Sequence, residues 1–171
     1  MASRIKISLK NEMTAYFAFF QITVLTSLSM LSVTKIFRFE MAHALNGYQG
    51  PCRFIHGHSY ELHVSICPVH TSHEYIPAPG ILYDFKELKK LVQETVISRL
   101  DHHLVLSAEY MEKEKPQQTE ENLFIMDAEP SAENLLLWIR HNLLIILPAS
   151  IKLHALRLYE TKDSYAEWRS E

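Results

Sequence analysis

Apolar and polar residues alternate along two stretches in the first half of the chain. The first stretch, 34–45, carries apolar residues and one histidine on a single face: Phe37, Phe39, Met41 and His43. The second stretch, about 56–67, has a similar face made of His56, His58, Tyr60, Leu62 and Val64. A repeat of two is the pattern of a half-buried β-strand. We therefore expect two strands, joined by the Asn-Gly and Gly-Pro steps of residues 46–51.

The next two periodic stretches repeat every three to four residues, which predicts helices. One covers 83–100, where Asp84 can cap the N-terminus. The other covers 131–147, with Ser131 at the N-cap position and Pro148 just beyond its end. Both stretches place an apolar stripe on one side, so we expect each helix to pack on a sheet.

Two more stretches of strand pattern, 151–161 and 165–170, close the chain. Residues 107–129, which precede the second helix, are polar and acidic, and we expect a long loop or an insertion there. The predicted order is strand, strand, helix, helix, strand, strand. Two hairpins that flank two helices indicate an α+β fold with an antiparallel sheet.

Residues 13–34 form a run without a charge, between basic residues on both sides. Its length suits a membrane anchor or a long secretory signal. Its Thr and Ser residues, its Gln21 and the lack of a small-x-small cleavage site argue against both. The alternatives are an accessory strand or helix, or a start placed ahead of a natural one at Met30. We treat 1–33 as an N-terminal extension and 34–171 as one domain, and expect a cytoplasmic protein.

The composition adds three limits to this picture. The chain has 171 residues, of which 47% are hydrophobic and 22% charged, so a single packed domain is feasible. The net charge of -3 and the lack of a basic face argue against a nucleic-acid partner. The two cysteines, Cys52 and Cys67, form no disulfide framework. The ten histidines are many for this length, and they are clustered.

The histidine cluster is the first candidate site. His56 and His58 stand two apart on a predicted strand, so both rings project from one face and can reach one ion. A catalytic zinc ion commonly takes three protein ligands and keeps a fourth position for water or substrate. His43, at the end of the neighbouring strand, can supply the third ligand. The alternative is that His-Gly-His is only a polar turn at the start of a strand.

A cysteine lies in the loop before this strand. Cys52 could itself bind zinc, but three histidines already complete a catalytic set. A thiol near a cation ionises readily, which suits proton abstraction or nucleophilic attack. Cys67 falls inside the second strand and is expected to be a small core residue.

Two further groups can carry chemistry. Asp101 and His102, at the end of the first helix, can form a dyad in which the carboxylate orients the imidazole. Glu160, in the last long strand, can bind the guanidine-like edge of a ring through paired hydrogen bonds. The alternatives are a solvated helix end for the dyad and an ordinary surface residue for Glu160.

Together these pieces resemble one protein family. The segments "FEMAH", "CRFIHGHSYEL", "LYDFKELK", "LDHH", "PSAENL" and "YET" follow one another as in the 6-pyruvoyltetrahydropterin and 6-carboxytetrahydropterin synthases. The likeness runs from about residue 35 to about residue 162. The resemblance implies a T-fold subunit, with a four-stranded antiparallel sheet and two helices on one face. Such subunits form trimers or dimers of trimers, with the sites at subunit boundaries.

The resemblance also implies roles for the candidate residues. Zinc would be held by three histidines: His43, His56 and His58. Cys52 would be the catalytic base, and Asp101 with His102 the partner dyad for proton transfer. Glu160 would anchor the pterin ring, and Glu133 would help to shape its pocket.

The implied substrate is 7,8-dihydroneopterin triphosphate. Three residues separate Cys52 from His56, as in the carboxytetrahydropterin branch, whereas animal-type pyruvoyl synthases usually have five. This spacing favours 6-carboxy-5,6,7,8-tetrahydropterin with loss of acetaldehyde and triphosphate, a step toward queuosine and related deazapurines. The alternatives are the pyruvoyl product, a catalytically silent T-fold protein that binds a pterin or purine, and a membrane-anchored or exported zinc protein.

Overall fold

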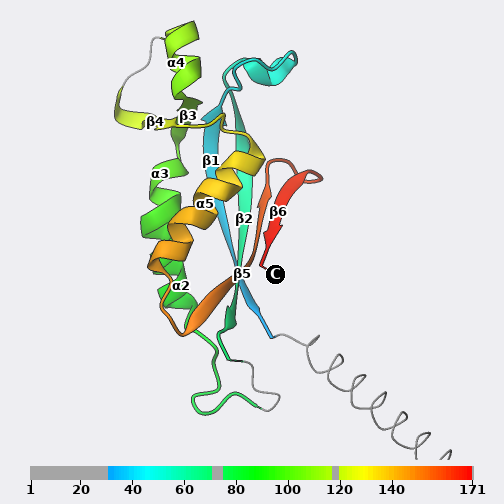
Figure 1. Cartoon of the computed structure of the whole chain (residues 1–171), viewed down its shortest axis with the longest axis vertical. Coiled ribbons are helices and arrows are strands. Elements are labelled where there is room, and N and C mark those ends of the chain that lie inside the picture. The colour runs from blue at the N-terminus through cyan, green and yellow to red at the C-terminus, as the bar shows by residue number, and fades with distance from the viewer. Residues whose placement is uncertain (1–30, 71–74, 117–119, 171) are drawn as a thin grey trace, which may run out of the picture. The chain divides into compact units, whose positions relative to one another are not determined.

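Two long strands form the centre of the sheet, as the alternating patterns predict. β1 (Val33–His43) and β2 (His56–Pro68) pair antiparallel along their whole length, from Val33 opposite Ile66 to His43 opposite His56 (Figure 1). The computed structural model describes residues 31–70, 75–116 and 120–170. The predictions about the N-terminal extension therefore lie, except for its last residues, outside the described residues.

The sheet is larger than the predicted one. It has six strands in the order β4-β3-β1-β2-β5-β6. The two C-terminal strands, β5 (Ile151–Tyr159) and β6 (Tyr165–Arg169), continue the antiparallel pairing from β2, as predicted. On the other side, β3 (His103–Ser107) and β4 (Leu123–Met126) add a parallel pair next to β1. The prediction of a four-stranded antiparallel sheet was therefore wrong, because the sheet is mixed.

The two added strands come from segments that were assigned to other structure. The first helix ends at Leu100, as predicted, but the chain turns there into β3, a strand that we did not predict. Asp101 is extended and His102 adopts a left-handed backbone with φ 59°. This turn redirects the chain within two residues. β4 is a four-residue apolar run inside the polar segment that we predicted as a loop, and a run so short has no readable period.

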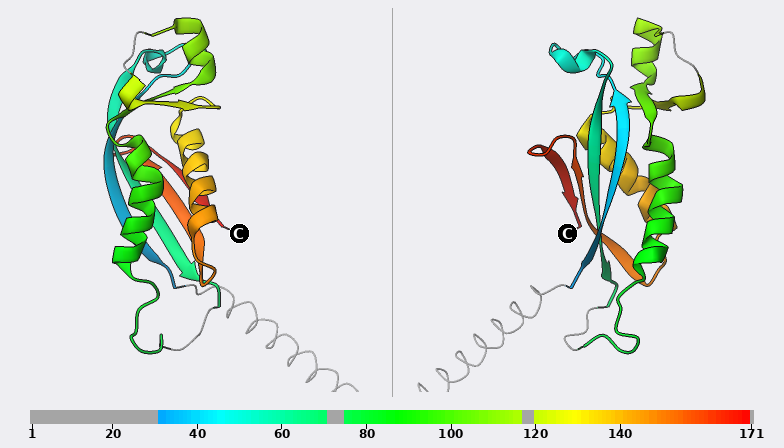
Figure 2. Two further views of the ribbon diagram at one scale, coloured as in Figure 1. Left: turned by 90° about the vertical axis from the view of Figure 1, so that its left-hand side faces the viewer. Right: turned by 180° about the vertical axis from the view of Figure 1, so that it is seen from behind.

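The two predicted helices are confirmed and cover one face of the sheet (Figure 2). The first is α2 (Phe85–Val92), continued by the π-helical turn η2 (Gln93–Ile97) and by α3 (Ser98–Leu100). The second is α5 (Ala132–Ile146). Their caps are as predicted, since Asp84 accepts from the Lys86 amide at 2.7 Å and Ser131 accepts from the Asn134 amide at 3.3 Å.

Three short helical elements complete the chain: η1 (Pro51–Arg53), α4 (Ala108–Glu114) and η3 (Glu120–Asn122). The segment 107–129 thus contains a helix and a strand, not only a loop. Among the described residues, no helix combines the length and the apolar character that a membrane span requires.

Alternation of side chains divides the sheet into an apolar and a polar face. The apolar face packs against α2, α3 and α5 through residues such as Phe39, Leu62 and Leu158. The opposite face carries ion pairs, for example between Arg157 and Glu167 at 2.6 Å. The three clustered histidines lie in β1 and β2, on the same face as the core, where the two strands meet the η1 loop.

Candidate active site

The register of β1 and β2 brings the three histidines together. His43 lies opposite His56, and His58 lies opposite Met41. The ring centroids are 4.6 Å apart for His43 and His56, 5.3 Å for His43 and His58, and 4.8 Å for His56 and His58. One nitrogen from each ring lies within 4.8 Å of the other two. The predicted convergence of the three rings is confirmed, and they form a group that can hold a metal ion.

The backbone fixes which nitrogens face each other. Nδ1 of His43 is 2.7 Å from the Pro130 carbonyl, and Nδ1 of His56 is 2.8 Å from the Phe54 carbonyl. A carbonyl can only accept, so both Nδ1 atoms carry the proton and both Nε2 atoms carry a lone pair. These Nε2 atoms are 3.2 Å apart. Neutral rings held in this way cannot hydrogen bond to each other, and a cation between them would satisfy both.

The third ring points to the same conclusion. Nε2 of His58 is buried and has no hydrogen-bond partner within the described part of the chain. An orphaned buried nitrogen is costly unless something binds it. The His43 ring is 1% exposed, and this burial lowers its pKa, which favours the neutral ligand form. Three neutral imidazoles form a donor set that suits zinc.

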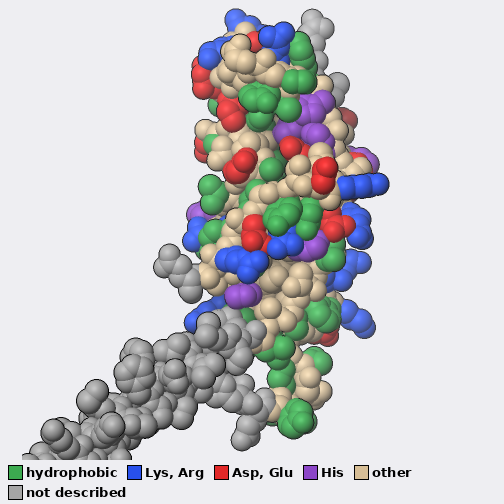
Figure 3. Space-filling view, turned by 90° about the vertical axis from the view of Figure 1, so that its right-hand side faces the viewer, with side chains coloured by type: hydrophobic (Ala, Val, Ile, Leu, Met, Phe, Trp, Pro, Cys, Tyr) green, Lys and Arg blue, Asp and Glu red, His purple; other side chains and the backbone are tan. Residues whose placement is uncertain are grey.

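A carboxylate stands at the open side of this group. Glu160 is the first residue after β5, which ends at Tyr159, whereas we predicted Glu160 inside a strand of residues 151–161. Its Oε1 atom is 3.4 Å from Nε2 of His43 and 3.9 Å from Nε2 of His58. The Tyr60 hydroxyl donates to the same oxygen at 3.3 Å. Burial raises the pKa of Tyr60, so this phenol remains a donor. Figure 3 shows histidine side chains gathered on this side of the molecule, with acidic side chains nearby.

A cavity of about 270 Å³ is lined by one histidine of the group and by three of the other predicted residues. Its lining includes His43, Cys52, Glu133 and Glu160. Cys52 is half-buried in η1, and its carbonyl accepts from the Leu45 amide at 2.9 Å, which closes the loop between β1 and β2. The structure therefore brings the thiol, the two carboxylates and His43 to one cavity, and His43 belongs to the histidine group.

The second cysteine lies apart from this cavity. Cys67 is 2% exposed in β2, and burial raises the pKa of its thiol. It is the core residue that the strand pattern predicted.

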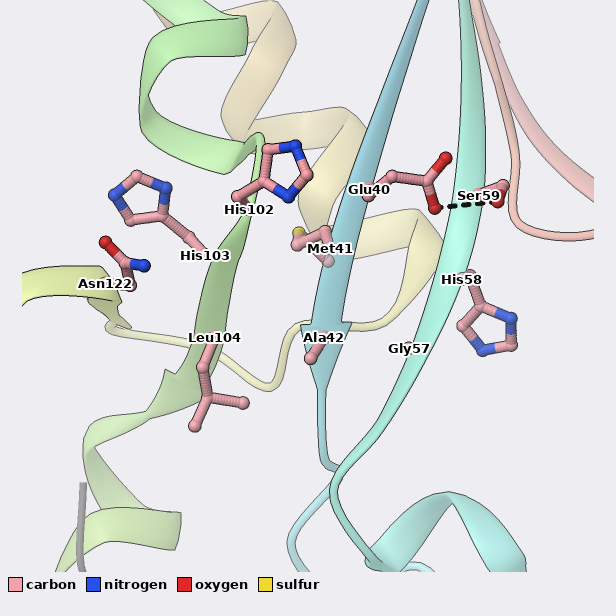
Figure 4. A pocket seen from close by; sticks show the side chains of 10 residues that line it. All are labelled: Glu40, Met41, Ala42, Gly57, His58, Ser59, His102, His103, Leu104 and Asn122. Atoms are coloured by element: carbon pink, nitrogen blue, oxygen red, sulfur yellow. Dashed lines mark hydrogen bonds between the residues drawn. The ribbon is translucent and has the colours of Figure 1, made fainter. Parts of the chain in front are cut away.

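The predicted dyad lies at a different place. Asp101 and His102 form the turn between α3 and β3, where Oδ1 of Asp101 accepts from the Glu40 amide at 3.0 Å. The same oxygen is 3.8 Å from Nε2 of His102, too far for a hydrogen bond, and the His102 side chain is 77% exposed. His102 lines a second cavity of about 440 Å³ with Glu40, Ser59 and others. In Figure 4 it stands beside β1, while the His58 ring projects away from β2.

Neither member of the dyad lines the cavity that contains Cys52. His58 lines the second cavity together with His102, so the histidine group lies between the two cavities, with His43 at the first and His58 at the second.

Three groups that contact the site could not be identified from the sequence. Tyr60 was assigned to the histidine face of β2 but received no role, and the Pro130 carbonyl gives no side-chain signal at all. Glu129 accepts from the Asn46 amide at 2.7 Å and from the Ser107 hydroxyl at 2.6 Å. It thereby links the segment after His43 to the end of β3. Nothing in the local pattern distinguishes this carboxylate from the other acidic residues of 107–129.

Comparison with known proteins gives a consistent result. Residues 32–171 match the family model described as 6-pyruvoyl tetrahydropterin synthase. A relative from Rickettsia typhi, named 6-carboxy-5,6,7,8-tetrahydropterin synthase, is 26% identical over 81% of this chain and 99% of its own length. The protein of that name from Haemophilus influenzae is 28% identical over 82% of this chain and 99% of its own length. The 6-pyruvoyl tetrahydrobiopterin synthase of Poecilia reticulata is 24% identical over 81% of this chain and 90% of its own length.

Solved structures share the fold. The 6-pyruvoyl tetrahydropterin synthase of Caenorhabditis elegans aligns with a TM-score of 0.61 at 18% identity, over 84% of this chain and 98% of that one. The enzyme of the same name from Plasmodium falciparum aligns with a TM-score of 0.62 at 20% identity, over 83% and 98%. At this identity the likeness concerns the T-fold alone.

Proposed function

This chain belongs to the 6-pyruvoyl tetrahydropterin synthase family, a group of lyase-type enzymes, and from that premise we propose that it is a zinc-dependent 6-carboxytetrahydropterin synthase. The substrates would be 7,8-dihydroneopterin triphosphate and one water molecule, and the products 6-carboxy-5,6,7,8-tetrahydropterin, acetaldehyde and triphosphate. The observation that carries the proposal is that Cys52 and Glu160 line one cavity with His43, which forms a possible metal site with His56 and His58.

The residues of this cavity divide the work. Zinc on the three histidines would supply positive charge to polarise the hydroxyls of the substrate side chain. Cys52 takes a proton from a side-chain carbon. Glu160 holds the amino group and ring nitrogen of the pterin by paired hydrogen bonds. Glu133, on the wall of the same cavity, limits where the ring can lie.

The dyad would act from a second copy of the chain. Neither Asp101 nor His102 lines the Cys52 cavity of its own chain, and the exposure of His102 leaves its ring accessible to a neighbour. Among the described residues, β1 pairs with β3 only at Met41–His43, so Val33–Glu40 leaves an open edge away from β2. β6 is the open edge on the other side. Pairing between copies closes such edges, which supports a homo-oligomer, a trimer or a dimer of trimers.

Two observations favour 6-carboxytetrahydropterin as the product. Six relatives carry the carboxytetrahydropterin name, one of them as a putative enzyme. In addition, three residues separate Cys52 from His56. The alternative product is 6-pyruvoyltetrahydropterin, which the name of the Poecilia reticulata relative represents. In this alternative the same cavity and the same residues serve a reaction that only eliminates triphosphate.

One experiment tests the function. The zinc-loaded protein is incubated with 7,8-dihydroneopterin triphosphate, and the products are identified by mass. We expect carboxytetrahydropterin and acetaldehyde, and no turnover after the metal is removed with a chelator. Pyruvoyltetrahydropterin would establish the alternative product. Absence of any turnover by the zinc-loaded protein would contradict the enzyme proposal and leave a pterin-binding protein without catalysis.

A further inference from the structure

We infer that Glu160 is a fourth metal ligand in the substrate-free protein. When substrate binds, this carboxylate leaves the metal and forms hydrogen bonds to the pterin ring. The ligand half of the inference stands on geometry alone. The exchange half rests on the proposed function, because it needs a pterin in the cavity. Glu160 would therefore couple the arrival of substrate to the opening of a coordination position.

Two separations in this group are close to those of a tetrahedral site. Zinc bonds of 2.0–2.2 Å to nitrogen and oxygen give ligand-to-ligand separations of about 3.3 to 3.5 Å. Nε2 of His43 is 3.2 Å from Nε2 of His56 and 3.4 Å from Oε1 of Glu160. Oε1 is 3.9 Å from Nε2 of His58, so a small contraction brings this pair into the same range.

The orientation of the His43 ring gives a reason to expect a cation at this short contact. Nδ1 of His43 donates to the Pro130 carbonyl, so Nε2 presents a lone pair to the carboxylate at 3.4 Å. A lone pair and an anion repel each other unless a cation lies between them.

The carboxylate is also held in this orientation. Tyr60 donates to Oε1, the same oxygen that faces the histidines. The Tyr60 ring is 1% exposed and stacks on Phe39 with centroids 5.2 Å apart. It also meets the rings of His43 and His58 edge-on, at 6.2 Å and 5.7 Å. A packed phenol of this kind keeps Oε1 directed at the metal position, as outer-shell partners of metal ligands do.

The exchange follows from the number of oxygens. A carboxylate binds the amino and ring nitrogens of a pterin through two parallel hydrogen bonds, which use both oxygens. Oε1 cannot serve the metal and the ring with full strength at once. Binding of the ring therefore frees a coordination position, which the hydroxyls of the substrate side chain can fill. Linkage requires that a pterin ring without that side chain and the metal weaken each other's binding.

The first test measures metal affinity without substrate. Zinc is titrated against a chromophoric chelator for the wild type, Glu160→Gln, Glu160→Ala and the matched control Glu133→Gln. Glu133 lines the same cavity but makes no contact with the histidine nitrogens among the interactions of the described residues. We expect zinc affinity to fall at least tenfold in both Glu160 variants, and to stay within twofold in Glu133→Gln. Wild-type affinity in Glu160→Gln would overturn the ligand assignment.

A spectrum separates ligation from simple attraction between charges. The visible absorption of Co²⁺ in place of zinc reports the ligand set, so it should change in Glu160→Gln. Weaker binding with an unchanged Co²⁺ spectrum would show that Glu160 acts only by its charge, and would overturn the inference. The wild-type protein provides a test without mutation, in which unsubstituted pterin should alter the Co²⁺ spectrum and weaken metal binding. Pterin binding without either effect would overturn the exchange.

These readouts are independent of turnover. A protein that shows the Glu160 effects on metal binding but does not convert dihydroneopterin triphosphate would refute the proposed reaction and keep the ligand. A protein that turns over the substrate while Glu160→Gln binds zinc normally would keep the reaction and refute the ligand.

Discussion

The Cys52 cavity and the Asp101–His102 turn are built in opposite ways. In the cavity, the key groups are buried or half-buried, and backbone carbonyls and a buried tyrosine fix their orientation. In the turn, His102 has a left-handed backbone conformation, and its side chain is 77% exposed. Its ring lies too far from the Asp101 carboxylate for a hydrogen bond. A buried and oriented group can bind a metal within one chain. An exposed dyad requires a partner surface to fix it.

Loss of one histidine of the group should have the largest effect, and this effect is on zinc affinity. His56→Ala removes one of three nitrogens, so zinc affinity should fall by more than roughly 100-fold, beyond the usual loss of an outer-shell partner. Turnover should disappear with the metal. Equilibrium dialysis with metal analysis measures the first effect.

A matched control for this change lies on the other face of the sheet. His63 is in the same strand and contacts Glu61 at 2.7 Å. His63→Ala should bind zinc as the wild type does. Equal zinc loss in both variants would mean that the effect comes from β2 as a whole and not from a ligand.

Removal of the thiol should separate catalysis from metal binding within the same cavity. Cys52→Ala should lower the turnover number by roughly 10²- to 10⁴-fold, the usual contribution of a general acid or base. Zinc content should remain that of the wild type, because three histidines hold the metal without the thiol. Zinc loss together with activity would make Cys52 a ligand and contradict its assignment as a base.

Glu129 offers a smaller effect that touches both regions. It accepts from the Asn46 amide, three residues after His43, and from the Ser107 hydroxyl at the end of β3. Glu129→Gln replaces an acceptor by a donor at one oxygen and should lower the free energy of unfolding by about 1–3 kcal/mol. The midpoint of thermal unfolding should therefore fall by several degrees.

The control for this change is a carboxylate of the nearby helix α4. Glu109 pairs with Lys113 on the surface at 2.6 Å. Because exposed ion pairs contribute little to stability, Glu109→Gln should lower the midpoint of thermal unfolding less than Glu129→Gln does. Equal effects in the two variants would show that Glu129 is not a link between the regions.

The difference between the two regions also explains what the sequence could predict. The strands β1, β2, β5 and β6 and both long helices follow from local periodicity and caps. The histidine group follows from the same pattern, because residues two apart share a face and neighbouring strands meet at their ends. β3 and β4 have four or five residues and depend on pairing with distant segments, so their local pattern was not informative. The turn at His102 was likewise not predicted, because the sequence indicated only that the helix ends there.

The contacts that orient the site residues could not be predicted from the sequence for another reason. Pro130 acts through its carbonyl, 87 residues away from His43, and Tyr60 acts on a residue 100 positions later. Such pairs exist only because the sheet and α5 place them together. Residue type and spacing could identify the three histidines that can hold a metal ion, but not the groups that orient them.

Mixed oligomers test most directly whether the two regions form one catalytic site across a subunit boundary. Cys52→Ala and His102→Ala chains, each inactive alone, are mixed in equal amounts, dissociated and reassembled, and the turnover of dihydroneopterin triphosphate is measured. Random mixing should place an intact Cys52 cavity against an intact dyad at about a quarter of the boundaries, so about a quarter of the wild-type activity should return. Mixed oligomers that form but remain inactive would contradict a site shared between chains.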